Sequence, residues 1–81
     1  MAGPDRRLRA VPTMHPVDSS AVAAVGYDPR TQDLFVRFVG PGLYAYAGVE
    51  EATYTALRAA ESVGAFVNEV IKPHHPVTRC G

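Results

Sequence analysis

The triplet Gly40-Pro41-Gly42 constrains the fold of this chain more than any other feature, because it separates two segments with strand character. Pro41 fixes its own φ angle and Gly42 can adopt a positive φ, so together they favour a reversal of the chain. The segments on either side, 33–39 and 43–47, follow the two-residue periodicity of strands. We therefore predict an antiparallel hairpin whose two strands are these segments.

The first strand of this hairpin has two different faces. Alternate residues form two sets, Leu34, Val36 and Phe38 in one and Phe35, Arg37 and Val39 in the other. We expect the first set to face the helices that follow. The second set would then lie on the opposite face, where a small sheet has little to cover it. An apolar pair around Arg37 that is left half open predicts self-association, with a two-fold homodimer as the simplest form.

The second strand carries Tyr44 and Tyr46, which are two residues apart and therefore lie on one face. Exposed aromatic rings on a sheet can stack on unpaired bases. Alternatively, both rings pack under the helices with their hydroxyls at the edge. We expect at least one ring to belong to the core, because so small a domain has few large side chains to fill it.

The remaining segments complete a small α+β fold. Residues 21–27 read as a preceding strand, in which Gly26 fits a bulge or a close approach by another backbone. Apolar residues at three- and four-residue spacing predict a helix over 50–60. Ser62 is a good N-cap for a second helix over 63–72. We therefore predict a three-stranded antiparallel sheet with two short helices packed on one face.

The two ends of the chain look irregular. Residues 1–18 contain three prolines and little apolar periodicity, which favours a flexible arm or an extended strap. The arm is locally basic, through Arg6, Arg7 and Arg9. The segment from Pro73 to Gly81 is expected to be irregular. Residues 77–81 are its C-terminal tail, and the folded domain is predicted to span residues 19–76.

Charge and cysteine content limit the function classes. Eight basic and eight acidic residues give a net charge of zero, so any nucleic-acid surface must be local. A single cysteine, Cys80, excludes an internal disulfide framework and fits a reducing compartment. No apolar run approaches the roughly 20 residues needed to span a bilayer. We expect a cytoplasmic protein that does not interact with membranes.

Patterns typical of catalysis and metal binding are absent from the sequence. His74 and His75 are adjacent, so they cannot share a helix face, and no carboxylate stands nearby at metal-ligand spacing. The chain has no nucleophile elbow and no phosphate-binding glycine loop. We expect no catalytic residues, no metal, no cofactor and no enzymatic activity.

The order of these elements resembles the KTSC domain, a short module named for its occurrence at the C-terminus of some lysyl-tRNA synthetases. The resemblance covers about residues 19–76 and rests on the ordered set rather than on any single piece. The matching residues are Ser20 before Val22, Gly26-Tyr27-Asp28, Leu34 with Val36 and Phe38, Tyr44-Ala45-Tyr46, Val49, Tyr54 with Leu57, Ser62-Val63-Gly64-Ala65-Phe66-Val67-Asn68, and Ile71-Lys72.

The resemblance implies a stand-alone bacterial form of a non-catalytic binding module. Its association with synthetases implies RNA as the ligand, whereas the catalytic parts of a synthetase have no counterpart in so short a chain. The candidate RNA contacts are Tyr44, Tyr46, Arg37 and Lys72, with Arg79 beside Lys72 in a mildly basic C-terminal segment. The alternative is a protein interaction or assembly module that does not bind nucleic acid. RNA binding requires an accessible tyrosine beside a cation, whereas a protein module requires only an apolar patch with a polar rim.

Overall fold

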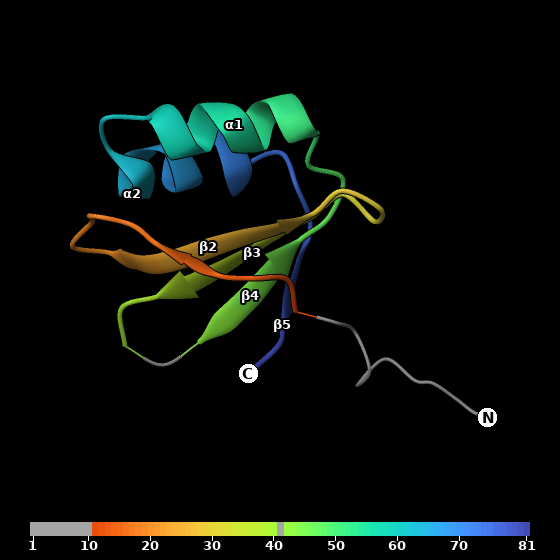
Figure 1. Ribbon diagram of the computed structural model, residues 1–81, viewed down its shortest axis with the longest axis horizontal. Coiled ribbons are helices and arrows are strands. Elements are labelled where there is room, and N and C mark those ends of the chain that lie inside the picture. Colours follow the sequence, from red (N-terminus) through yellow and green to blue (C-terminus); the bar gives the residue numbers. More distant parts are fainter. Residues whose placement is uncertain (1–10, 41) are drawn as a thin grey trace.

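Each strand of the sheet pairs in antiparallel fashion with the next strand along the chain (Figure 1). This computed structural model describes residues 11–40 and 42–81. The strands are β1 (His15–Pro16), β2 (Val22–Asp28), β3 (Asp33–Phe38), β4 (Leu43–Tyr46) and β5 (Val77–Arg79). The predicted α+β class is confirmed, but the prediction of three strands is wrong, because the sheet has five.

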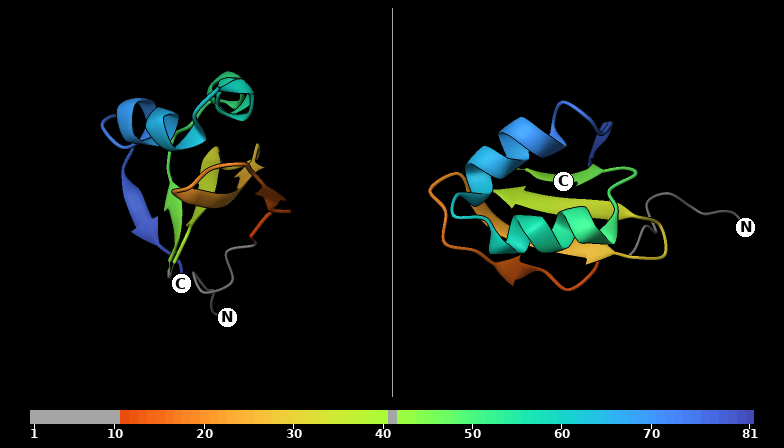
Figure 2. Two further views of the ribbon diagram at one scale, coloured as in Figure 1. Left: turned by 90° about the vertical axis from the view of Figure 1, so that its left-hand side faces the viewer. Right: turned by 90° about the horizontal axis from the view of Figure 1, so that it is seen from above.

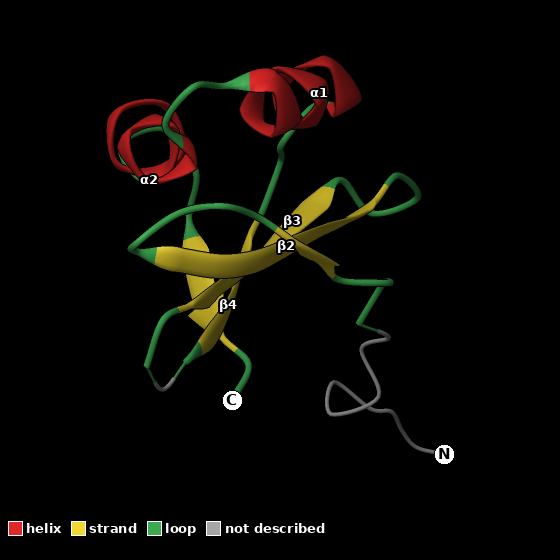
Figure 3. Cartoon of the chain, turned by 60° about the vertical axis from the view of Figure 1, so that its left-hand side comes forward, coloured by secondary structure: helices red, strands yellow, loops and turns green. Residues whose placement is uncertain are grey.

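The helical segments cover one face of this sheet. α1 (Glu51–Ala59) is followed by α2 (Val63–Phe66), which continues directly into the π-helical segment η2 (Val67–Ile71). Figure 2, seen from above, shows both helical runs lying over the sheet, and Figure 3 shows the two layers from another side. The Ser62 hydroxyl accepts a hydrogen bond from the Ala65 N–H at 3.1 Å, as expected for an N-cap.

The π-helical turn aligns the second helix with the core. Val63, Val67 and Ile71 are spaced four residues apart, and all three are buried. Four residues of an α-helix overshoot a full turn by about 40°, so a purely α-helical run would rotate Ile71 away from the stripe. The wider turn, closed by the Lys72 N–H donating to the Val67 carbonyl at 2.9 Å, removes this overshoot. The sequence pattern indicated a helix but not this change of pitch.

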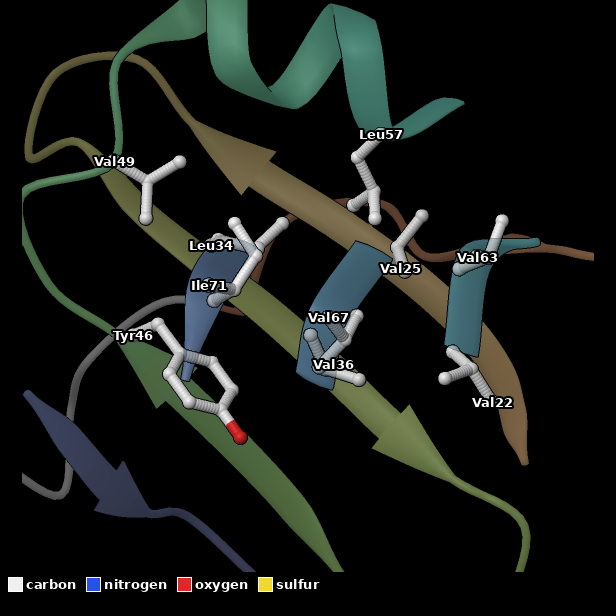
Figure 4. Close-up of a cluster of buried hydrophobic side chains, with 10 residues drawn as sticks. All are labelled: Val22, Val25, Leu34, Val36, Tyr46, Val49, Leu57, Val63, Val67 and Ile71. Carbon is white, nitrogen blue, oxygen red and sulfur yellow. The ribbon is translucent and has the colours of Figure 1, made fainter. Parts of the chain in front are cut away.

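The main core lies between the helices and the sheet. The predicted helix-facing residues of β3 are confirmed, since Leu34 and Val36 are fully buried and Phe38 packs against the cluster. The buried residues of this core are Val22, Val25, Leu34, Val36, Tyr46, Val49, Leu57, Val63, Val67 and Ile71 (Figure 4).

The opposite face of the sheet is partly covered by residues 11–16. Met14 packs against a small cluster formed by Phe35, Leu43 and Ala45, in which Phe35 is fully buried. The expectation that Phe35 lies half open is therefore wrong. Of the two forms considered for the N-terminal segment, its described part is an extended strap; its three arginines lie outside the described residues. Self-association, which that open face motivated, stays a prediction.

The strap can lie this close because β2 has a glycine at the crossing point. A Cβ atom built on Gly26 would lie 2.8 Å from both the Met14 sulfur and the Thr13 carbonyl oxygen. The expected close approach of another backbone at Gly26 is confirmed. The bulge that was the alternative is also present, but it lies between Val22 and Ala24.

The C-terminal tail is a strand rather than an irregular segment, which corrects the prediction for residues 77–81. β5 pairs with β4 through register partners Val77 with Tyr46 and Arg79 with Tyr44. Main-chain hydrogen bonds extend this pairing at both ends, including Ala47 N–H to the Pro76 carbonyl at 2.9 Å. All three residues of β5 are exposed, so no apolar alternation marks the strand in the sequence.

Two glycine substitutions are expected to change stability in opposite directions. Gly26→Ala should lower the free energy of unfolding by about 1–3 kcal/mol, because its methyl group overlaps the strap. Gly64→Ala should raise it by about 0.4–1 kcal/mol, because the helical Gly64 has only ordinary contacts near its Cβ position. Denaturant unfolding of both variants measures this. Equal midpoints for Gly26→Ala and the wild type would contradict the close approach.

Candidate nucleic-acid interface

A cavity of about 460 Å³, open to solvent, lies where β4 and β5 meet the end of η2. We call it the tyrosine cavity. Its lining residues are Phe38, Tyr44, Tyr46, Lys72 and Val77. A volume of this size is within the range of small-molecule sites, roughly 300–1,000 Å³. Among the described residues, the lining is mainly aromatic and apolar, and it includes one cation and no carboxylate.

Tyr46 forms the inner wall of the tyrosine cavity. The residue is 3% exposed and belongs to the main core, which confirms the expectation that at least one tyrosine is core. In Figure 4 its hydroxyl points away from Leu34 and Ile71. Burial raises the pKa of Tyr46 above its usual 10.0, with a smaller contribution from Tyr44. Tyr46 is therefore a neutral phenol over the physiological pH range.

Tyr44 is half-buried and lies nearer the hairpin turn. Its ring meets the ring of Phe38 edge-on, with centroids 5.6 Å apart. The ring also fills the space next to Gly42, where a Cβ atom would lie 2.7 Å from the Tyr44 Cε1 atom. Gly42 has a φ of 129°, so the predicted positive φ is confirmed; Pro41 lies outside the described residues. Glycine at this position therefore permits both the turn and the position of the Tyr44 ring.

Two cations stand beside these rings. The Lys72 ammonium lies 5.3 Å from the centroid of Phe38, and the Arg79 guanidinium lies 5.9 Å from the centroid of Tyr44. Both distances are within cation–π range. Lys72 and Arg79 are exposed, so each can contact an anion while remaining near its ring. Two cations therefore lie close to the tyrosine cavity although the whole chain has no net charge.

Arg37 does not belong to this group. It alternates with Val36 and Phe38, which face the helices, and its register partner Leu43 belongs to the cluster beneath the sheet. Of the four residues predicted as RNA contacts, the fold therefore brings together Tyr44, Tyr46 and Lys72 and places Arg37 on the other face.

Two residues at the tyrosine cavity, Val77 in its lining and Arg79 beside Tyr44, were not among the predicted site residues. The sequence marks Arg79 only as part of a mildly basic segment, because residues 77–81 carry no strand pattern. Directly opposed residues of antiparallel strands share a face, so the register puts Arg79 beside Tyr44 and Val77 beside Tyr46. No signal in the sequence marks this register.

The other two tyrosines form a separate pair with internal partners. The rings of Tyr27 and Tyr54 stack with centroids 5.0 Å apart. The Tyr27 hydroxyl donates to the Val49 carbonyl at 2.5 Å, and the Tyr54 hydroxyl accepts from Arg58 at 2.9 Å. Burial raises the pKa of Tyr27, and the nearby carboxylates, led by Glu51, add to the effect. This pair joins β2 to α1 and has a structural role.

A second depression of about 440 Å³ lies between the start of β2 and the second helix. It gathers several residues of the family pattern: Ser20, Ser62, Gly64 and Asn68 are among its lining residues. Asn68 is exposed. The hydroxyls of Ser19 and Ser62 already accept main-chain hydrogen bonds, so they stabilise the local turns.

Two further features of the described residues bear on function. No cluster of three or more histidine, cysteine or carboxylate side chains is placed to hold a metal ion within residues 11–40 and 42–81. Over the same residues, no helix has the length and apolar character needed to cross a membrane.

The fold and the tyrosine cavity define a small α+β domain with an aromatic, cation-rimmed site, and comparison with known proteins identifies the family. Residues 18–75 match the family model of the KTSC domain. A KTSC domain protein of Yersinia pestis superposes with a TM-score of 0.82 at 35% identity, over 85% of this chain and 97% of that structure. The chain belongs to the KTSC domain family, as its landmark residues indicated.

Two bacterial relatives support this assignment. A protein of Tsukamurella paurometabola is 50% identical over 60 residues, covering 74% of this chain and 90% of the relative. An uncharacterized protein of Stutzerimonas stutzeri is 41% identical over 59 residues, covering 73% of this chain and 83% of the relative. These relatives are themselves short, so the chain resembles a stand-alone form of the domain.

The two cavity tyrosines are expected to differ in their contribution to stability. Tyr46→Ala should lower the free energy of unfolding by about 3–5 kcal/mol, because it leaves a hole in the main core. Tyr44→Ala should cost about 1–2 kcal/mol, because the half-buried ring packs mainly against Phe38. Denaturant unfolding compares the two. If both substitutions lowered the free energy of unfolding equally, the difference in burial would not determine how much each tyrosine stabilises the fold.

Proposed function

We propose that this domain is a non-catalytic module that binds single-stranded RNA, and that the tyrosine cavity holds one unpaired nucleotide. The observation that supports this most strongly is the presence of two cations beside two half-buried aromatic rings that line the same cavity. Sites for single-stranded nucleic acid combine these two elements, a stacking surface for the base and a positive groove for the backbone. We also propose a cytoplasmic location, where such a ligand is present.

The aromatic floor suits a base. Tyr44 and Phe38 present an edge-on aromatic pair, and base–aromatic stacking contributes roughly 1–3 kcal/mol per base. The Arg79 guanidinium lies near the Tyr44 ring and is itself a planar group on which a base can stack. A base entering here would therefore contact a plane of Tyr44 or of Arg79.

The rim suits a phosphate. The Lys72 ammonium and the Arg79 guanidinium are exposed and stand beside different rings of the same cavity. No carboxylate is among the cavity's described lining residues. With a net charge of zero, affinity for RNA has to come from a local group of cations, and Lys72 and Arg79 form such a group.

An assembly module is the second candidate, and the outer edge of β5 favours it. β5 ends the sheet, and Val77 is 52% exposed on it. An edge strand offers unpaired main-chain groups to another strand, so a second copy of this chain can pair its β5 with this one about a two-fold axis. Sedimentation at micromolar concentration is expected to detect a dimer if this candidate is correct, whereas a monomer at every concentration would exclude it.

Removing the two rim cations should weaken RNA binding, whereas removing Arg37 should not. Lys72→Gln and Arg79→Gln each delete one exposed charge beside the cavity, and Arg37→Gln deletes an exposed charge on the other face. Fluorescence anisotropy with a labelled single-stranded RNA of mixed sequence, measured across salt concentrations, gives the affinity. We expect the slope of log affinity against log salt concentration to be shallower by about 0.7 for each cavity variant, because one phosphate fewer is neutralised.

The matched control is the Arg37→Gln variant, whose affinity and salt dependence should equal those of the wild type. A wild-type protein that binds no RNA at low salt would overturn the proposed function. Equal weakening by all three substitutions would show that RNA binding, if present, uses no particular face of the domain.

A further inference from the structure

The Tyr46 hydroxyl is a buried polar group for which the described part of the chain provides no hydrogen-bond partner. Its residue is 3% exposed, and buried hydroxyl groups of tyrosine normally have a partner. Tyr27 and Tyr54 follow this rule, since their hydroxyls bond to Val49 and Arg58. Tyr46 differs from them because it lines the tyrosine cavity.

The position of this hydroxyl is fixed by the core. The Tyr46 ring packs within the main cluster, and its register partners are Leu34 on β3 and Val77 on β5. Figure 4 shows the hydroxyl directed away from the aliphatic side chains of Leu34 and Ile71. A ring held in this way presents its hydroxyl at one depth in the cavity. A preorganised polar group inside an apolar site is what confers orientation and specificity on a ligand.

We propose that the Tyr46 hydroxyl hydrogen-bonds to the edge of one nucleobase inserted into the tyrosine cavity, so that the module distinguishes among bases. This inference rests on the proposed function and adds to it. The rim cations and the half-buried ring of Tyr44 accept any nucleotide, because every base has a π-face and every nucleotide a phosphate. A hydroxyl at fixed depth contacts only bases whose donor or acceptor lies at the matching position on the edge.

The test compares Tyr46→Phe with the wild type on four homopolymeric RNA oligonucleotides, of A, C, G and U, and on an abasic oligonucleotide. We expect the wild type to prefer one base, and the affinity of Tyr46→Phe for that base to be about three- to tenfold lower. Binding of the other homopolymers and of the abasic chain should not change. Tyr54→Phe is the matched control, because it removes a hydroxyl bonded to Arg58 outside the cavity, and it should keep the preference.

A thermal unfolding measurement checks that the Tyr46→Phe variant is folded. Tyr46→Phe removes no hydrogen bond to a described residue, so its thermal midpoint should match that of the wild type or exceed it. If the wild type binds the homopolymers equally, or if Tyr46→Phe keeps the wild-type preference, the inference fails while the proposed function stands. If the wild type binds none of the oligonucleotides, both fail.

Discussion

The pairing of β4 with a strand on each side is the constraint on which the rest of the structure depends. β4 pairs with β3 along one edge and with β5 along the other. These two pairings determine which face of the sheet each side chain of β4 occupies. Tyr46 is thereby held against the helices, and Tyr44 is placed opposite Arg79. Without β5 the tyrosine cavity would lack Val77 in its wall and Arg79 at its rim. The C-terminal strand therefore completes both the sheet and the site.

Much of the fold could be predicted because its signals are local. The alternation in β3, the positive φ of Gly42 and the N-cap at Ser62 are each a property of a few neighbouring residues, and each is present. The edge strands β1 and β5 could not be predicted in this way. They are two and three residues long with exposed side chains, and main-chain pairing rather than an apolar pattern holds them in the sheet.

The candidate site was predictable in part for the same reason. The spacing of Tyr44 and Tyr46 indicates that they share a face, but only the packing beneath Ile71 and its neighbours decides that Tyr46 is core. Whether Lys72 or Arg37 accompanies them depends on cross-strand register and on the π-helical turn that ends before Lys72. Neither is encoded in a short sequence pattern.

A titration of the isotope-labelled protein with single-stranded RNA, followed by amide chemical shifts, tests the central claim most directly. We expect the largest shifts on β4, β5 and the end of η2, and no change in the residues around Tyr27 and Tyr54. Shifts confined to the face that carries Phe35 and Arg37, or no shifts at all, would contradict it.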